Sequence, residues 1–233
     1  MADNDIKKAE GTQLSRRQFI TGVGGVGVGA LLGGVLTPGF LAPDTAIAIP
    51  ASQGYLLVDK TECAGCTSCM AACSLVHEGS VNLSLSRIQI LRNPLIGFPN
   101  DITPQQCHQC VYPACVEACP TGALHVDAAN GNVRTVDEGK CIGCERCVNA
   151  CPFTPSRAIW NGADKHAQKC DLCADTPFWN EKGGVGGKQA CVAVCPAGAI
   201  KFTREIPSQD GKGYDIDMYP TLPDVRGWGT VTA

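Results

Sequence analysis

Aromatic residues are scarce in this chain of 233 residues, since Phe, Trp and Tyr together make up only 6% of it. Glycine and proline are plentiful by contrast, with 27 and 15 copies. Large rings supply much of the area that a protein buries in its core. We therefore expect only a small apolar core, so something other than side-chain packing must hold much of the fold together.

An excess of positive charge is missing as well. The chain has 19 Lys and Arg against 22 Asp and Glu, a formal net charge of −3, which gives no sign of a basic surface for nucleic acid. Two glycine-rich stretches, 22–27 and 183–188, are also poor nucleotide motifs. The first has no strand–helix context, and the second breaks the phosphate-loop spacing. The sequence therefore predicts neither nucleic acid nor nucleotide as a partner.

No motif for acid–base or nucleophilic catalysis stands out, but the chain has 16 cysteines. They fall into four groups of four with none left over, and each group ends in C-x-x-x-C. A proline follows three of these groups, whereas Ser74 takes that place in the first. In chain order, the groups are Cys63, Cys66, Cys69, Cys73; Cys107, Cys110, Cys115, Cys119; Cys141, Cys144, Cys147, Cys151; and Cys170, Cys173, Cys191, Cys195.

The third group has the spacing of a bacterial iron–sulfur motif. Its sequence, "CIGCERCVNACP" (Cys141 to Pro152), matches C-x-x-C-x-x-C-x-x-x-C-P, in which the fourth cysteine binds a neighbouring cluster. Disulfides fit poorly, because cysteines three residues apart rarely have the required geometry. Zinc would normally draw a second pair of ligands from a distant segment. We therefore predict four [4Fe–4S] clusters, with one cysteine per iron and all sixteen cysteines as iron ligands.

The segments between the cysteine groups predict short strands. "ALHVDAANGNVRTVD" (123–137) predicts a β-hairpin around Asn130-Gly131, a favoured turn dipeptide. "CPTGAL" (119–124) and "CPAGAI" (195–200) are near repeats. The expected fold over residues 49–206 is therefore α+β, a duplicated ferredoxin-like domain with two dicluster units, short helices and long cluster-binding loops. Other strand candidates are 55–59, 86–91 and 199–206.

Residues 1–48 have the features of an export signal. Arg16 and Arg17 lie in "SRRQFI", ahead of an uncharged stretch from Gln18 to Pro43. Ala46-Ile47-Ala48 then offers a small-residue cleavage pattern. The arginine pair indicates the twin-arginine route, which exports folded proteins, so the expected location is the periplasm, where a partner could attach the protein to the membrane. A retained membrane anchor is the alternative for this segment.

Three further features invite an interpretation. Residues 174–190 separate the second and third cysteines of the last group and predict a surface insertion that contacts a partner, with Trp179 in it. Residues 207–233 show no helical or strand period, so we expect an irregular tail that is free or wraps a partner. His108 and His166, near cysteines, are candidates for hydrogen bonds beside a cluster, whereas His77 and His125 show no special feature.

The cysteine groups resemble those of four-cluster electron-transfer subunits that accompany molybdenum or tungsten bis-pterin enzymes of the dimethyl sulfoxide reductase family. The resemblance covers residues 54 to about 206, including "CHQCVYPACVEACP" and "KCDLC". It implies that ligands cross between groups. The implied sets are Cys63, Cys66, Cys69 with Cys195; Cys170, Cys173, Cys191 with Cys73; Cys107, Cys110, Cys115 with Cys151; and Cys141, Cys144, Cys147 with Cys119.

The expected function is a one-electron relay and not catalysis. The resemblance implies a molybdenum- or tungsten-pterin catalytic subunit at one end, and a membrane quinone-reactive subunit or a cytochrome at the other. Within the relay, a periplasmic nickel–iron hydrogenase is the alternative partner. Outside it, the alternatives are a free soluble polyferredoxin and a small reductase acting at an exposed cluster.

Overall fold

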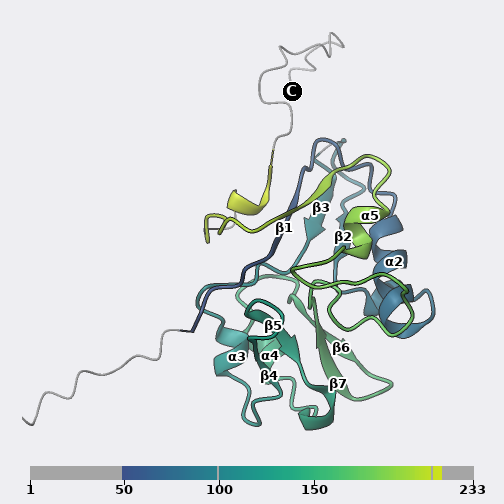
Figure 1. Ribbon diagram of the computed structural model, residues 1–233. Coiled ribbons are helices and arrows are strands. Elements are labelled where there is room, and N and C mark those ends of the chain that lie inside the picture. The colour runs from purple at the N-terminus through teal and green to yellow at the C-terminus, as the bar shows by residue number, and fades with distance from the viewer. Residues whose placement is uncertain (1–48, 99, 211, 217–233) are drawn as a thin grey trace, which may run out of the picture. The chain divides into compact units, whose positions relative to one another are not determined.

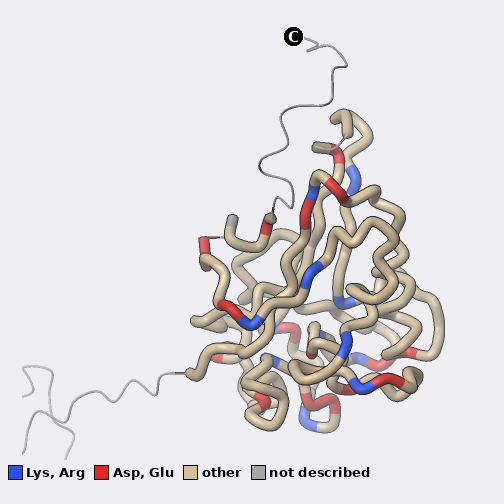
Figure 2. The backbone as a smooth tube through the Cα atoms, turned by 45° about the horizontal axis from the view of Figure 1, so that its top comes forward, with Lys and Arg blue, Asp and Glu red and all other residues tan. Residues whose placement is uncertain are grey.

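A computed structural model describes residues 49–98, 100–210 and 212–216, which belong to a single unit (Figure 1). The predicted export signal, the alternative membrane anchor and the tail beyond residue 216 lie outside the described residues. Within the described part of the chain, no helix has the length and apolar character needed to cross a membrane. Acidic and basic residues are interspersed along this part, in keeping with the nearly balanced composition (Figure 2).

The described strands form four separate two-stranded antiparallel sheets. The sheet β1–β8 joins the two ends of the domain, with Tyr55 opposite Thr203. The other three pairs are close in sequence. The pairs are β1 (Tyr55–Val58) with β8 (Ile200–Thr203), β2 (Gln89–Arg92) with β3 (Ile102–Gln105), β4 (Leu124–Asp127) with β5 (Val133–Val136), and β6 (Ala158–Asn161) with β7 (His166–Lys169).

Each C-x-x-x-C segment starts a helix, and proline decides how long it lasts. The helices are α2 (Ser68–Glu78), α3 (Ala114–Glu117), α4 (Arg146–Ala150) and α5 (Ala190–Ala193). The three short ones precede a Cys-Pro pair, whose proline cannot continue a helix. In α2 the corresponding residue is Ser74, so the helix runs on for 11 residues. It ends at Gly79, which caps it in the left-handed conformation at φ 70°.

The helices pack in two pairs. Helix α2 lies against α5, which also contacts β8, and α3 lies against α4. Helix α3 contacts β4, and α4 contacts β6, so the second pair belongs with the sheets β4–β5 and β6–β7 (Figure 1). Short 3₁₀ turns complete the structure at η2 (Leu83–Leu85), η3 (Glu138–Lys140) and η4 (Lys212–Tyr214).

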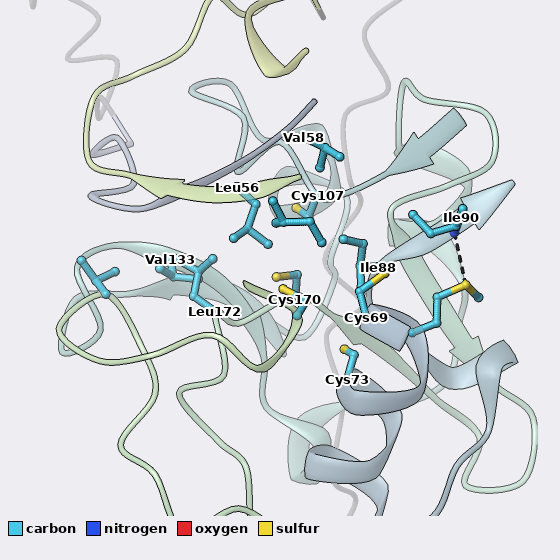
Figure 3. Close-up of a cluster of buried hydrophobic side chains, with 14 of the residues drawn as sticks. Leu56, Val58, Cys69, Cys73, Ile88, Ile90, Cys107, Val133, Cys170 and Leu172 are labelled. Atoms are coloured by element: carbon cyan, nitrogen blue, oxygen red, sulfur yellow. Dashed lines mark hydrogen bonds between the residues drawn. The ribbon is translucent and has the colours of Figure 1, made fainter. Parts of the chain in front are cut away.

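The main core is small and includes cysteines among its apolar side chains. Leu56, Val58 and Leu172 pack in one cluster with the cysteines of α2 and of the loops around residues 107 and 170 (Figure 3). The thiols of Cys107 and Cys170 thus lie among the residues that a conventional core would use for packing. This arrangement accounts for a fold with so few aromatic residues.

The structure confirms an α+β fold and most of the predicted strands. The hairpin around Asn130-Gly131 is β4–β5, and the candidates at 55–59 and 199–206 are β1 and β8. The candidate at 86–91 is offset, since β2 begins only at Gln89. Strands β3 and β7 were not anticipated, because neither has a clear alternating apolar pattern.

The first part of the C-terminal tail, contrary to expectation, packs on the chain's own domain. Tyr214 is fully buried, its ring stacks on His108 at 3.8 Å, and its hydroxyl donates to the His108 carbonyl. The backbone of Asp215 forms an isolated β-bridge with Val58, and its carboxylate lies 3.0 Å from the Lys60 amine. A free tail is therefore wrong for residues 212–216, whereas contact of the tail with a partner stays a prediction.

The insertion at 174–190 also makes contacts within the chain. Trp179 is half-buried and packs against the small cluster of Val76, Cys173 and Ala190. Phe178, which is exposed, lies over Gly79 at the end of α2. Trp179 thus fixes the insertion to α2, and its predicted role in partner contact stays a prediction.

Candidate functional site

The four cysteine loops share one backbone feature. In each C-x-x-C segment the residue before the second cysteine has a left-handed conformation, with φ between 46° and 69°. Two loops use glycine there, at Gly65 and Gly143, for which this conformation has no steric penalty. The other two use Gln109 and Leu172, which are fully buried. Because such a conformation is costly for these side chains, their contacts must compensate.

Gln109 shows what such a compensation is. Its side-chain amide donates to the Cys170 carbonyl at 2.8 Å and accepts from the Arg134 backbone N–H at 2.8 Å. One buried side chain thereby connects the second cysteine loop to strand β5 and to the fourth cysteine loop. Leu172 packs in the main core instead.

Three cavities are lined by cysteines that come from different sequence groups. We call their thiol sets sites 1, 3 and 4. The empty volume, which is partly open to solvent, is about 370 Å³ at site 1, about 370 Å³ at site 3 and about 330 Å³ at site 4. The lining cysteines are Cys63, Cys66, Cys69 and Cys195 at site 1; Cys107, Cys110, Cys115 and Cys151 at site 3; and Cys119, Cys141, Cys144 and Cys147 at site 4.

The remaining four cysteines form site 2, and all of them are buried. Burial raises the pKa of Cys191 well above its usual value, and the thiols of Cys173, Cys73 and Cys170 raise it further. Such mutual effects require the thiols to lie close together. The members of site 2 are Cys73, Cys170, Cys173 and Cys191.

Most of the inward-facing thiols are poor thiolates in the absence of a cation. Burial, reinforced by neighbouring thiols, raises the pKa of Cys69 and Cys173 to about 12 and that of Cys110 and Cys147 to about 11. A positive iron centre offsets the free-energy cost of deprotonating these thiols, because metal binding displaces the proton. These four groups are therefore suited to receive metal and not to remain as free anions.

Backbone N–H groups point at sulfur atoms of these sites. The donors to the terminal cysteines are Arg87 to Cys73 at 3.3 Å, Leu124 to Cys119 at 3.3 Å and Arg157 to Cys151 at 3.2 Å. At site 3 the Gln109 N–H also donates to Cys107 at 3.4 Å. Hydrogen bonds of this kind stabilise a negatively charged sulfur and tune any metal bound to it.

Site 2 has a buried ion network beside it. His77 Nε2 lies 3.1 Å from Asp171 Oδ1, and the guanidinium of Arg87 lies 3.3 Å from the same oxygen. His77 Nδ1 lies 3.8 Å from the Cys73 sulfur. Burial opposes both charges, but their hydrogen bond prevails and holds the pKa of Asp171 at about 2 and that of His77 at about 9. The expectation that His77 has no special feature is therefore wrong.

The two predicted histidines have different positions. His108 lines site 3 between Phe153 and Tyr214, and burial followed by the charges of Arg157 and Lys169 lowers its pKa to about 4. Its Nδ1 finds no hydrogen-bond partner among the described residues. His166 lies 3.2 Å from Glu138 and lines none of the cavities at sites 1, 3 and 4.

The sequence patterns missed the basic residues beside the thiols. Lys169 donates to the Cys107 sulfur at 2.6 Å, and Arg134 and Arg157 line the same cavity. Lys169 directly precedes Cys170 in "KCDLC", so its position was a usable signal. Arg134 had none, because it comes from the middle of the hairpin β4–β5.

The four sites lie in a row. Cys69 of site 1 raises the pKa of Cys191 in site 2, and Cys107 of site 3 raises that of Cys170 in site 2. Site 4 adjoins site 3, since Cys115 raises the pKa of Cys147. The order is therefore 1–2–3–4. Only Cys66 and Cys144 among the sixteen thiols are exposed, and they belong to the two outer sites.

The residues of these sites fit iron–sulfur clusters. Each site offers four thiols, which is the donor set that [4Fe–4S] clusters prefer. In the described residues, no three His, Cys, Asp or Glu side chains are grouped as the ligands of one metal ion. A cluster takes one thiol at each iron, so its ligands stand further apart than those of a single ion.

Comparison with known proteins gives the class first. Residues 99–205 match the family described as the 4Fe-4S dicluster domain. A Haemophilus influenzae protein, NrfC homolog, is 36% identical, with 82% of this chain and 80% of the relative covered. The thiosulfate reductase electron transfer subunit PhsB of Salmonella typhi is 38% identical, and the match covers 66% of this chain and 77% of that relative. The hydrogenase-2 operon protein HybA of Escherichia coli O157:H7 is 32% identical, and the match covers 82% of this chain and 63% of that relative.

The chain thus contains a dicluster iron–sulfur domain. More closely, it belongs to the family of ferredoxin-type [4Fe–4S] electron-transfer subunits that includes NrfC, PhsB and HybA. This membership confirms that the protein is an electron-transfer subunit of an oxidoreductase complex and not itself an enzyme.

Proposed function

We propose that the chain carries four [4Fe–4S] clusters, one at each of sites 1 to 4, with all sixteen cysteines as ligands. When bound, such clusters supply reversible one-electron chemistry at potentials set by their surroundings. The chain's own residues hold the clusters apart, exclude water from site 2, and direct N–H groups at the sulfurs. This assignment includes the crossed ligand sets implied by the family resemblance.

The observation that carries the proposal is the row of thiol sites with exposed members at its two ends. Cys66 at site 1 and Cys144 at site 4 are exposed, whereas site 2 is buried throughout. A row that reaches the surface at both ends suits a protein that takes electrons from one partner and passes them to another. A catalytic site would instead need an open ligand position and a pocket for substrate.

The proposed partners are a molybdenum- or tungsten-pterin catalytic subunit at one end and a membrane quinone-reactive subunit or a cytochrome at the other. The similarity to PhsB supports this assignment, because that relative is the electron transfer subunit of a thiosulfate reductase. The similarity to HybA, a hydrogenase-2 operon protein, favours a nickel–iron hydrogenase as the second candidate partner.

Metal analysis of the native complex separates these two candidates. The protein should be tagged after residue 233, expressed at its natural level and isolated anaerobically with whatever copurifies. Molybdenum or tungsten in proportion to the chain, without nickel, supports the pterin partner. Nickel in that proportion supports the hydrogenase. A chain that is isolated alone, yet reduces several unrelated enzymes, would favour a free polyferredoxin instead.

We further propose that the two helix pairs represent two dicluster halves of a duplicated ferredoxin. Sites 1 and 2 use the cysteines of α2 and α5, and sites 3 and 4 use those at α3 and α4. The near repeats "CPTGAL" and "CPAGAI" follow α3 and α5, one in each half. Because each helix pair supplies cysteines to two sites, each half would bind two clusters.

Export by the twin-arginine route to the periplasm remains a proposal that rests on Arg16 and Arg17. Changing both to Lys keeps the charge but removes the pair that defines the signal. We expect the variant to accumulate in the cytoplasm, measured by cell fractionation and immunoblotting. Unchanged export in a strain that lacks the partner subunits would contradict the assignment.

A further inference from the structure

Three basic side chains surround site 3. Arg134, Arg157 and Lys169 line its cavity together with the four thiols. Lys169 is 4% exposed and Arg134 is 0% exposed, whereas Arg157 is half-buried. Lys169 and Arg134 come from strands β7 and β5, which pack beside each other. The fold thus brings these charges together from distant parts of the chain.

Within the described part of the chain, no carboxylate balances these charges. None of the ion pairs among the described residues involves Arg134, Arg157 or Lys169, and no Asp or Glu lines the cavity. Arg134 donates to the Asn132 carbonyl, but its Nε and Nη2 atoms find no partner in the described structure. Buried charges are normally paired. The unpaired cations therefore point to an anionic occupant.

Lys169 is the cation closest to the thiols. Its Nζ lies 2.6 Å from the Cys107 sulfur, which is its one hydrogen-bond partner among the described residues. The side-chain amine of Lys169 therefore lies directly beside a ligand-bearing sulfur.

The other sites differ from site 3 in charge. At site 2, Arg87 and His77 face the buried carboxylate of Asp171, and Glu78 lies 4.0 Å from Arg87. The site 1 cavity has no charged residue in its lining, and the site 4 cavity has only Glu145. Site 3 consequently has the most positive surroundings of the four.

Positive charge favours the reduced form of a cluster, because reduction adds one electron and no compensating proton is required. The effect is strong in a buried site, where the effective dielectric constant is low. Given four clusters as proposed above, we infer that Lys169, supported by Arg134 and Arg157, gives the site 3 cluster the highest reduction potential. The first electron to enter the row then comes to rest at site 3, inside the protein and one site away from the end at Cys144.

Redox titration followed by electron paramagnetic resonance tests this inference on the full chain, purified anaerobically. In the unsubstituted protein, the first signal to appear on stepwise reduction should belong to site 3. A Cys110→Ser variant identifies that signal, because it alters one ligand of site 3 alone. If Cys110→Ser changes a later signal and leaves the first one intact, the inference is wrong.

The charge itself is tested by Lys169→Met, which keeps a side chain of similar length and removes the ammonium. We expect the site 3 signal to move to a more negative potential while the iron content and the other signals stay unchanged. Lys169→Arg retains the charge and should leave the potential close to that of the unsubstituted protein. Lys188→Met, which removes an exposed lysine paired with Glu181, is the matched control and should shift nothing.

Each outcome has a definite meaning. If Lys169→Met keeps its iron and all its potentials, Lys169 has only a structural role and the inference fails. If Lys169→Met loses the site 3 cluster, Arg157→Met takes its place and should give a smaller shift of the same signal. If the unsubstituted protein contains no clusters, the proposed function fails and not the charge argument alone.

Discussion

The two outer sites and the two inner sites differ in the exposure of their thiols and in the charges that surround them. Sites 1 and 4 expose one thiol each, at Cys66 and Cys144, and no basic residue lines their cavities. Sites 2 and 3 lie between them and have charged side chains beside them, among them the buried Asp171 and Lys169. On the proposed function, the exposed thiols of the outer sites would serve exchange with partners, and the charges at the inner sites would set stability and potential.

The comparison is tested most strongly by removal of iron. The main core contains thiols of both inner sites, so loss of the clusters would leave buried thiols in place of bonds. Because ligation free energy is folding free energy in such proteins, we expect the iron-free chain to lose cooperative unfolding altogether. Circular dichroism during thermal unfolding, before and after anaerobic chelation, measures this. A sharp transition that persists without iron would show that apolar packing alone suffices.

Single ligand substitutions distinguish an inner site from an outer one. Cys73→Ser alters site 2, inside the core, and should lower the iron content of more than one site or prevent folding. Cys144→Ser alters exposed site 4 and should perturb one cluster, a loss of up to about four iron atoms. Iron analysis and electron paramagnetic resonance of the two variants provide the measurement. Equal damage from both would remove the distinction between inner and outer sites.

The ion network at site 2 should contribute to stability. Asp171→Asn leaves the buried Arg87 and His77 without their carboxylate, and breaking such a buried pair costs about 3–5 kcal/mol. The exposed pair of Lys188 and Glu181 is the control, since Glu181→Gln should cost about 0–1 kcal/mol. Anaerobic chemical denaturation gives both values. Similar small losses for the two variants would mean that the site 2 network is not structural.

The outer sites should depend on loop backbone more than on charge. In Gly143→Ala the new Cβ would lie 2.6 Å from the Lys165 carbonyl oxygen at φ 69°. In Gly122→Ala, at φ 66°, it would meet nothing within 4 Å. The control, Gly122→Ala, should therefore lower the free energy of unfolding by about 1–2 kcal/mol for its left-handed conformation alone. Gly143→Ala should lower it by more. Thermal unfolding of both variants measures the difference, and equal losses would exclude a steric role for Lys165.

The cysteine spacing predicted the local structure well, because it acts over a few residues. The C-x-x-x-C helices, the effect of proline on their length and the Asn130-Gly131 hairpin all follow from short-range rules. The crossed ligand sets came from the family resemblance, since spacing alone does not tell which loops meet. The export signal lies outside the described residues and stays a prediction.

The rest depended on contacts between distant residues. His77 and Asp171 are separated by 94 positions, and Lys169 and Cys107 by 62. Tyr214 lies in an irregular tail, yet it stacks on His108 more than one hundred positions earlier. No periodicity or motif marks such partners in a single sequence. The sequence could place Lys169 beside Cys170, but only the fold reveals that it faces Cys107.

The central claim is that all sixteen thiols hold iron. Iron and acid-labile sulfide should be determined per chain on protein purified without oxygen, together with its electron paramagnetic resonance spectrum after reduction. The account predicts about sixteen iron atoms per chain, four for each of four clusters, and signals from interacting reduced clusters. A value near eight, or a colourless sample without a signal, would contradict it.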